Sequence, residues 1–382
     1  MGYQRDCFWF SGYKPCRFGG QCQGCQTYRK PTRRIAVVSL EAMGAVLRST
    51  CLLGPILREY PGAHITWITM PNVKSLLAGN PMIHRLLTVQ ADMSAVWDHL
   101  QFDVLYAVDK SIAAGALAER ISAKEKKGFG LTPEGAIRTM TPDADELYRL
   151  GLDDHLKFHT NQKPETQLLT EAMGLPWKHD GYVLRLEKHE REEVVKRKKQ
   201  LLEGTKATRV IGFNTGCSTL FPYKKFTIER ACEVIRMWRK SYPDAVVALL
   251  GGREDTERQK AMKACFEEDS LVVNTPTTEG LRSGILWMAC SDFVLSGDSL
   301  GLHIAIALGK PVLSWFGVTC SAEIDLFDYG VKMQARVSCS PCWKKSCDQK
   351  VKCYDQVHVE DVFKGTETIF KRLERPLYAV NA

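Results

Sequence analysis

Short apolar runs alternate with amphipathic segments in the first half of the chain. The runs RRIAVVSL (33–40), HITWIT (64–69) and FDVLYAV (102–108) are rich in β-branched residues, and segments with apolar residues at helical spacing separate them. Short buried strands that alternate with helices are typical of a parallel sheet covered by helices. Residues 33–185 are therefore predicted to form one Rossmann-like domain.

The same alternation restarts after a charged segment. Residues 187–206 are rich in Lys, Arg and Glu, which predicts an exposed helix. Further short apolar runs follow at residues 209–216, 245–252, 270–274, 292–296 and 311–317. The pattern predicts an N-terminal arm (1–32), a first Rossmann-like domain (33–185), a linker helix (186–208) and a second Rossmann-like domain (209–382).

Composition agrees with a folded protein of two domains. Of 382 residues, 45% are hydrophobic and 25% are charged, which is ample for two packed cores. The formal net charge of +8 is dispersed, and it favours a phosphate-bearing ligand or an anionic membrane surface over nucleic acid. The sequence has neither a secretory signal nor an apolar run of about 18 residues. We therefore expect a cytoplasmic protein, with at most peripheral contact at the cytoplasmic face of the inner membrane.

One predicted helix begins with polar residues. In SGDSLGLHIAIALGKP (296–311), Asp298 is expected to cap a helix over residues 299–308, and Gly309 is expected to end it. A helix between two parallel strands begins at the carboxyl edge of the sheet, where its free N–H groups favour an anion. This edge is therefore a candidate phosphate site.

Two further polar residues of this helix are predicted to face that site. Ser299 and His303 lie four residues apart, hence on one helix face, and helical side chains lean toward the N-terminus. The imidazole is therefore expected to point back toward Ser299 and Asp298. A capping aspartate and a buried structural histidine explain the same pattern, and the sequence leaves both interpretations open.

Five segments carry a resemblance to a known family. They are RRIAVVSLEAMGAVLRSTCLLGPILREYPGAHITWIT (33–69), KKGFGLTPEG (126–135), IGFNTGCSTLFPYKKFTIER (211–230), LLGGREDTERQ (249–259) and GDSLGLHIAIALGKPVLSWFGVTCSAEIDL (297–326). Together they resemble the family 9 glycosyltransferases, the ADP-heptose lipopolysaccharide heptosyltransferases and their relatives. The resemblance implies a GT-B fold of the α/β class, with two Rossmann-like domains facing a central cleft. It also implies an acceptor on the first domain, a nucleotide-sugar donor on the second, and no catalytic metal.

The resemblance also implies which residues bind the donor. The start of the helix at 299–308 would surround the diphosphate and stabilise charge on the leaving nucleotide. Glu254, or Arg253 one residue earlier, would contact the ribose or base. The implied donor residues are Asn214, Thr215, Gly216, Thr219, Lys224, Glu254, Asp298, Ser299, Leu300, Gly301 and His303, and His303 is also a candidate catalytic residue.

Two positions depart from the family pattern. The family's general base is an Asp at the position of Ala45, and alanine cannot accept a proton. A phosphate-binding Lys of the family is replaced here by Thr219. Glu41 could supply a shifted base, and Lys224 with Lys225 could supply the missing positive charge. A surface role for each of these three side chains is the alternative.

Fourteen cysteines include two compact sets. In a cytoplasmic protein, such sets predict reduced thiols or metal sites rather than disulfides. Four thiolates can hold either a structural zinc ion or an iron–sulfur cluster. The candidate ligands are Cys7, Cys16, Cys22 and Cys25 in the arm, and Cys339, Cys342, Cys347 and Cys353 in the segment 339–353. Free thiols, or two sets that face each other, are the alternatives.

The favoured interpretation is an inverting glycosyltransferase. It would transfer a sugar, most plausibly heptose from ADP-heptose, to a lipopolysaccharide core or other cell-envelope glycan. Ala45 and Thr219 favour a second interpretation, a weakened or inactive nucleotide-sugar-binding or scaffold member of the family. A redox or sensor protein built on the cysteine sets is a third.

Overall fold

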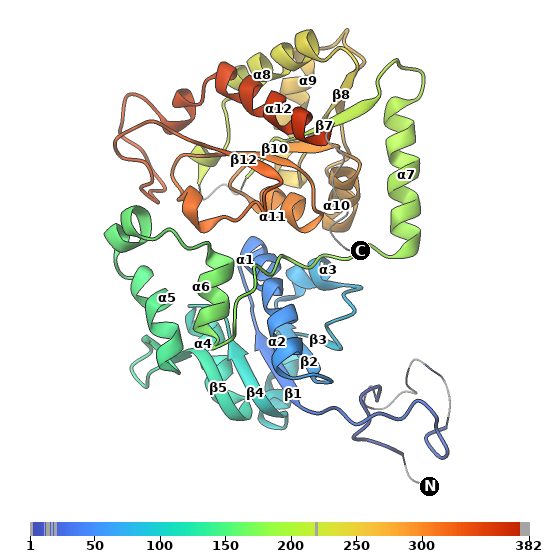
Figure 1. Ribbon diagram of the computed structural model, residues 1–382, viewed down its shortest axis with the longest axis vertical. Coiled ribbons are helices and arrows are strands. Elements are labelled where there is room, and N and C mark those ends of the chain that lie inside the picture. Colours follow the sequence, from blue (N-terminus) through green and yellow to red (C-terminus); the bar gives the residue numbers. More distant parts are fainter. Residues whose placement is uncertain are drawn as a thin grey trace. The chain divides into compact units, whose positions relative to one another are not determined.

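The computed structural model describes residues 3–10, 12, 16, 18, 21–217 and 221–374. Contacts divide the chain into two compact units. The first unit holds residues 1–42, 49–152 and 167–180, and the second holds residues 43–48, 153–166 and 181–382. Each unit is an α/β structure built on its own sheet (Figure 1).

The first unit is built on a mostly parallel sheet with the order β3-β2-β1-β4-β5-β6. β1 pairs in parallel with β2 and β4, and β5 pairs antiparallel with β6. The short apolar runs form the centre of this sheet because both of its faces are buried there. The strands are β1 (Arg34–Val38), β2 (His64–Thr69), β3 (Arg85–Thr88), β4 (Gln101–Ala107), β5 (Ser122–Leu131) and β6 (Ile137–Thr139).

Helices follow most of these strands along the chain. α4 packs against β1, β4 and β5 and is capped by Ser111, whose hydroxyl accepts from the Ala114 N–H. The helices before residue 180 are α1 (Met43–Ser49), α2 (Leu53–Glu59), α3 (Lys74–Leu77), α4 (Ile112–Arg120), α5 (Asp145–Leu150) and α6 (Glu165–Ala172).

The second unit repeats the plan with the strand order β12-β11-β10-β7-β8-β9, and its pairs are parallel. Figure 1 shows α8 and α12 on one face of the sheet and α10 and α11 on the other. Its strands are β7 (Arg209–Asn214), β8 (Ala245–Leu250), β9 (Val272–Asn274), β10 (Phe293–Gly297), β11 (Val312–Phe316) and β12 (Gly330–Gln334). Its helices are α7 (Lys188–Leu202), α8 (Ile228–Ser241), α9 (Thr256–Ala264), α10 (Leu281–Ala289), α11 (Leu300–Ala307) and α12 (Val359–Leu373).

Aromatic side chains fill the core between the second sheet and helices α8 and α12. Trp238 makes edge-to-face contacts with Phe213 and Phe293, and all three side chains are buried. The Trp238 Nε1–H donates to Thr366 Oγ1 at 3.0 Å, which satisfies the one polar atom of the buried ring. This core fixes the sheet whose strand ends carry the candidate site.

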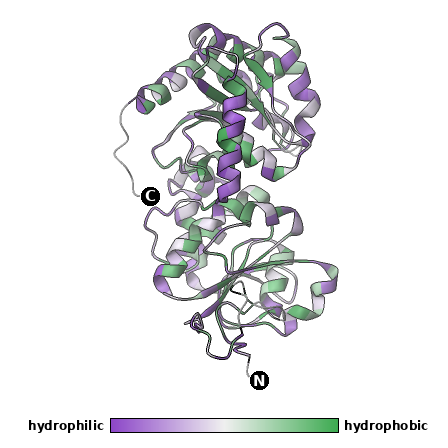
Figure 2. Ribbon diagram, turned by 90° about the vertical axis from the view of Figure 1, so that its right-hand side faces the viewer, coloured by the Kyte–Doolittle hydropathy of each residue, from purple (hydrophilic) through white to green (hydrophobic). Residues whose placement is uncertain are grey.

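The charged helix α7 begins with a capping box. The Glu187 side chain accepts from the backbone at Glu190, and the Glu190 carboxylate accepts from the Glu187 N–H at 2.8 Å. Figure 2 shows α7, which faces the viewer there, as hydrophilic along most of its length. The exposed charged helix predicted for residues 187–206 is therefore confirmed in its main part.

Part of the N-terminal arm packs on the first unit through Phe8. This ring is 4% exposed and makes edge contacts with His64 and His84, while the Arg29 guanidinium lies 4.5 Å from its centroid. A cavity of about 820 Å³ lies between the arm and the segment around the start of β2. The described cysteines of the arm do not line this cavity.

The predicted central strands are confirmed to within a few residues. Strands β3, β5, β6 and β12 were missed because their sequences mix charged and apolar residues and lack a short apolar run. Across the described residues, no helix combines the length and the apolar character that a membrane-spanning segment requires.

Candidate active site

The start of α11 differs from the prediction by one residue. Ser299 occupies the N-cap position with an extended backbone (φ −151°, ψ 176°), and no side-chain cap hydrogen bond is formed there. The prediction that Asp298 caps the helix is therefore wrong. Asp298 is only 9% exposed, and its carboxylate accepts instead from Lys224 Nζ at 2.9 Å. A buried carboxylate requires such a partner, since burial without one is costly. At the other end, Gly309 adopts φ 64° as expected.

Asn214 connects the end of β7 to the start of α11. Its Nδ2 donates to Ser296 Oγ and Ser299 Oγ at 3.0 Å each, and to the Gly216 carbonyl at 3.1 Å. A Cβ at position 301 would lie 2.5 Å from Asn214 Cγ, so glycine is required for this approach. The structure thus brings Asn214 to Ser299 and Gly301, although Ser299 follows Asn214 by 85 positions in the sequence.

The loop after β7 is held by buried polar contacts. Thr215 is 2% exposed, and its hydroxyl donates to the Leu250 carbonyl at 3.0 Å. A Cβ at Gly216 would lie about 2 Å from the Asp255 carboxylate, which accepts from the Gly252 N–H at 2.9 Å. Burial raises the pKa of Asp255. The sequence analysis did not identify Asp255, which follows the predicted Glu254 directly.

Three other predicted donor residues have different surroundings. Glu254 lies in a 3₁₀ turn (Arg253–Asp255) and is exposed. Leu300 begins α11 and is partly buried. Thr219 lies outside the described residues, so its predicted role as a donor residue is still a prediction.

His303 lies in the first turn of α11. Its Nε2 is 4.0 Å from Asp298 Oδ1, so the imidazole points toward this carboxylate as predicted. The residue is 6% exposed, and its Nδ1 has no hydrogen-bond partner among the described residues. Burial, followed by the positive charge of Arg48, lowers the pKa of His303 to about 4. The ring is therefore neutral at neutral pH.

Asp298, unlike His303, keeps its charge although it is buried. Burial opposes its charged form, yet the charge and the hydrogen bond of Lys224 lower the pKa of Asp298 below its usual range. Asp298, just before α11, therefore remains ionised, and Lys224 from the segment after β7 neutralises its charge. Free helix N–H groups and Lys224 make this point suitable for an anion.

Helix α1 supplies a second charged group to the same unit. A Cβ at Gly44 would lie 2.6 Å from His303 Cδ2, so this part of α1 lies directly against the imidazole. Arg48, one turn later, pairs with Glu165 at 2.6 Å between Nη2 and Oε1. Ala45 lies between them on α1 and is partly buried.

Lys157 and Glu323 complete this charged cluster, with 3.5 Å between Nζ and Oε1. Burial and the charge of Glu165 raise the pKa of Glu323 to about 6. The sequence analysis missed Arg48, Glu165 and Glu323, although the position of Arg48 one turn after Ala45 was readable.

Glu41, the candidate base, belongs to the first unit. It is exposed, and its N–H donates to Asp109 Oδ2 at 3.1 Å. Asp109 also accepts from the Leu40 N–H and from Ser39 Oγ. Burial raises the pKa of Asp109 to about 6. The role of Glu41 as a base is still a prediction.

The two cysteine sets are not arranged as ready metal sites. Among the described residues, no three His, Cys, Asp or Glu side chains are grouped as ligands of one ion. In the C-terminal set, burial raises the pKa of Cys353 to about 11, and the charges of Cys342 and Cys347 add to this effect. Cys342 packs against the small apolar cluster that contains Cys353. Zinc and iron–sulfur binding are still predictions.

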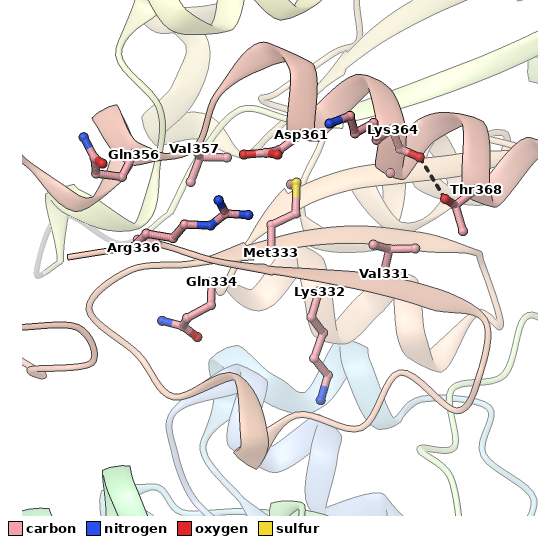
Figure 3. Close-up of a pocket in the computed structure, with 12 residues that line it drawn as sticks. Val331, Lys332, Met333, Gln334, Arg336, Gln356, Val357, Asp361, Lys364 and Thr368 are labelled. Carbon is pink, nitrogen blue, oxygen red and sulfur yellow. Dashed lines mark hydrogen bonds between the residues drawn. The ribbon is translucent and has the colours of Figure 1, made fainter. Parts of the chain in front are cut away.

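A separate cavity of about 510 Å³ lies between β12 and α12 (Figure 3). Figure 3 shows Arg336, Met333 and Asp361 around it, and Lys332 points away from them. The predicted donor residues do not line this cavity.

A family model now decides the classification. The model of glycosyltransferase family 9 (heptosyltransferase) matches residues 99–358, which is more than half of the chain. The chain belongs to glycosyltransferase family 9. No curated protein sequence is significantly similar to it.

Solved structures share its fold at low sequence identity. A family 9 glycosyltransferase from Veillonella parvula aligns with TM-score 0.69 and 17% identity, over 90% of this chain and 99% of that chain. The ADP-heptose lipopolysaccharide heptosyltransferase II of E. coli aligns with TM-score 0.65 and 14% identity, over 90% and 100%. The dodecameric iron-containing heptosyltransferase TibC, in complex with ADP-D-beta-D-heptose, aligns with TM-score 0.54 and 12% identity, over 91% and 79%. This member of family 9 therefore has the GT-B fold that was predicted, and its family is one of glycosyltransferases.

Proposed function

We propose that this family 9 member transfers heptose from ADP-heptose to a lipopolysaccharide core or another cell-envelope glycan. The observation that carries the proposal is the buried pair of Lys224 and Asp298 at the start of α11, beside Asn214 and Ser299. Positive charge and helix N–H donors at one point suit a nucleotide diphosphate. The names of the E. coli structures, which include ADP-heptose, support this choice of donor.

In the proposed reaction, the acceptor hydroxyl oxygen attacks the anomeric carbon of the donor. The bond between that carbon and the β-phosphate oxygen breaks, and its electron pair leaves with ADP. Lys224 and the N–H groups of α11 stabilise the charge that develops on the leaving phosphate. His303 acts as a neutral hydrogen-bonding group, because burial keeps its pKa near 4. The anomeric configuration is inverted by this single displacement, and no metal is assigned a step.

The test is selective binding of adenine nucleotides. A ligand at 100 times its dissociation constant adds about 2.7 kcal/mol to stability, which is readily seen as a rise in melting temperature. We expect ADP and ADP-heptose to stabilise the protein and UDP- and GDP-sugars to have little effect. Lys224→Ala should clearly reduce the ADP shift, while Lys240→Ala, an exposed lysine of α8, should leave it unchanged. Absence of any shift with all nucleotides would refute the proposal.

A second candidate function follows from Ala45. Its methyl group cannot accept a proton, so a member that binds the donor without transfer is the alternative. Release of ADP from ADP-heptose in the presence of heptose-free lipopolysaccharide separates the two. ADP-heptose binding without ADP release would favour the binding or scaffold role.

We further propose that the cysteine sets bind a structural metal, either zinc or an iron–sulfur cluster. The packing of Cys342 against the cluster that holds Cys353 supports the C-terminal set, and the iron-containing TibC supports iron as one candidate. The thiols as they stand are not grouped around one position, so they would have to converge on the ion. Metal analysis of the purified protein tests this, with Cys342→Ser and Cys347→Ser expected to lose the metal. Cys265→Ser, which alters an exposed cysteine outside both sets, is the control.

We place the protein in the cytoplasm, with peripheral contact at the inner membrane surface. The net charge of +8 supports attraction to anionic lipid. Co-flotation with phosphatidylglycerol vesicles at low salt, but not with phosphatidylcholine vesicles, is the expected result. Equal flotation with both would contradict an electrostatic contact.

A further inference from the structure

Two half-buried carboxyl groups lie in the second unit beside the candidate donor site. The Glu165 and Glu323 side chains are 24% and 14% exposed, and each has a cationic partner, Arg48 at 2.6 Å and Lys157 at 3.5 Å. The function assigned above gives neither carboxylate a role. Two half-buried glutamates in one charged cluster are costly unless they serve binding or chemistry.

Helix α1 connects these carboxylates to the position where the family resemblance expects a base. Arg48 follows Ala45 by three residues and Gly44 by four, so it is a neighbour of both on the surface of α1. Gly44 lies against His303 on this face, and Arg48 holds Glu165 one helical turn from Ala45. Arg48 thereby links the Glu165 carboxylate to the helix that carries Ala45.

Glu323 lies in the segment that follows β11, the strand after helix α11. It ends a 3₁₀ turn (Ser321–Glu323) in the segment after β11. β11 pairs in parallel with β10, with Trp315 opposite Gly297, so the segments that follow these strands leave the same edge of the sheet. Asp298 follows β10 directly. Asp298 and Glu323 therefore lie in segments that follow neighbouring strands at the carboxyl edge of the second sheet.

Asp298 and Glu323 have different environments, which shift their pKa values in opposite directions. Lys224 keeps Asp298 ionised and engaged. Burial and the nearby charge of Glu165 raise the pKa of Glu323 to about 6, while Lys157 and Arg48 oppose part of this shift. A carboxylate that exchanges its proton near neutral pH is matched to general base catalysis, whereas a permanently ionised one is not.

The His303 imidazole interacts with the charged groups of both the cluster and the donor site. Its Nδ1 is buried without a hydrogen-bond partner among the described residues, and the charges of Arg48, Asp298 and Glu165 all act on it. An unsatisfied buried nitrogen next to α1 requires a partner. A hydroxyl group of a bound sugar can supply one.

We propose that Glu323 is the general base of the transfer reaction and that Glu165, held by Arg48, is its positioning residue. Glu323 thereby takes over the task of the carboxylate that is absent at Ala45. The proton of the acceptor hydroxyl moves to a Glu323 carboxylate oxygen as the acceptor oxygen bonds to the anomeric carbon and ADP departs. Water later removes that proton. This inference rests on the proposed function.

The experiment compares ADP release from ADP-heptose, with heptose-free lipopolysaccharide as acceptor, by wild type, Glu323→Gln, Glu41→Gln and Glu268→Gln. Glu268 is an exposed glutamate outside the cluster and serves as the matched control. We expect Glu323→Gln to lower kcat by about 10²- to 10⁴-fold without changing ADP affinity. Glu268→Gln should stay within twofold of wild type, whereas Glu41→Gln tests the alternative base. The wild-type kcat/KM should rise through about pH 6, and Glu323→Gln should lose this dependence.

A rescue variant makes the test specific to base catalysis. Ala45→Asp introduced into Glu323→Gln restores a carboxylate at the family position, and at least tenfold recovery of kcat is expected. Glu165→Gln should lower the apparent pKa of the pH profile, because it removes a neighbouring negative charge. A merely structural role for Glu323 would give neither the rescue nor the change in pH dependence.

The opposing outcomes are distinct. A Glu323→Gln variant with wild-type kcat and pH profile overturns the assignment, and loss of activity in Glu41→Gln alone would move the base to Glu41. If the wild-type protein binds ADP-heptose without releasing ADP, and the variant Ala45→Asp does release it, then the wild-type chain lacks a base. That result also overturns the assignment. A wild type that binds no adenine nucleotide refutes the proposed function itself.

Discussion

Lys224 Nζ lies 2.9 Å from Asp298 Oδ2, so a lysine that follows β7 neutralises the aspartate that precedes α11. Both side chains are at most 14% exposed. The residues are 74 positions apart, and the parallel pairing of β7 with β10 brings them to one edge of the sheet. The pair places a lysine ammonium group at the carboxyl edge of the second sheet, where we propose that a nucleotide diphosphate binds.

Removal of this lysine should weaken nucleotide binding more than it weakens the fold. Lys224→Ala deletes a charge-assisted contact to phosphate, so we expect the ADP dissociation constant to rise by about 10- to 100-fold. It also leaves Asp298 buried without its cation, and Lys224→Ala combined with Asp298→Asn should recover the stability but not the affinity. Calorimetric titration with ADP and urea unfolding measure the two effects. Unchanged ADP affinity in Lys224→Ala would remove Lys224 from the donor site.

A single methyl group on α1 should disturb His303. Gly44→Ala places a Cβ 2.6 Å from His303 Cδ2, and the imidazole is enclosed by Tyr182, at 5.8 Å between ring centroids. We expect a loss of about 1–3 kcal/mol in the free energy of unfolding, together with weaker ADP binding. Gly284→Ala in α10 is the matched control, since a Cβ there meets nothing within 4 Å. It should be neutral or stabilise the protein by up to about 1 kcal/mol. Equal effects of the two substitutions would contradict the packing of α1 on His303.

Asp109 should hold the segment that joins β1 to α1. Asp109→Ala leaves the Leu40 and Glu41 N–H groups and the Ser39 hydroxyl without this acceptor. The expected cost is about 1–3 kcal/mol in the free energy of unfolding, measured by urea denaturation. Asp92→Ala, which removes an exposed aspartate of the same unit, should cost less than about 0.5 kcal/mol. A variant Asp109→Ala as stable as wild type would show that the carboxylate does not support this segment.

Two buried histidines should make the fold acid-sensitive. Burial lowers the pKa of His64 and of His303 from 6.5 to about 4. The unfolded chain therefore binds protons that the native protein refuses, and stability should fall as the pH decreases from about 6.5 to about 4. Each histidine accounts for up to about 3 kcal/mol of this loss.

The corresponding measurement is the free energy of urea unfolding at a series of pH values. His64→Gln removes one titrating group, so its stability should depend less steeply on pH in this window. A slope identical to that of wild type would mean that His64 is not buried as a neutral ring.

The sequence by itself determined the α/β class, the central strands and the α11 segment. Runs such as those at β1, β8 and β11 are buried on both faces of a parallel sheet, so each residue must be apolar and the pattern is legible. Gly309 was readable for a similar local reason, since its φ of 64° favours glycine. Strand β5, SAKEKKGFGL, was not readable, because its exposed residues are free to be charged.

Only the tertiary structure decided which polar side chains meet. A cap was expected at Asp298 from its place in the sequence, but its partner is Lys224, and the sheet order rather than chain distance brings the two together. Likewise, Arg48, Glu165 and Glu323 lie on separate segments and carry no motif, and burial together with the charge of Glu165 raises the pKa of Glu323 to about 6. Backbone and burial preferences are local and periodic, so they are visible in the sequence. Electrostatic partners are set by long-range packing, which the order of residues does not encode in any short pattern.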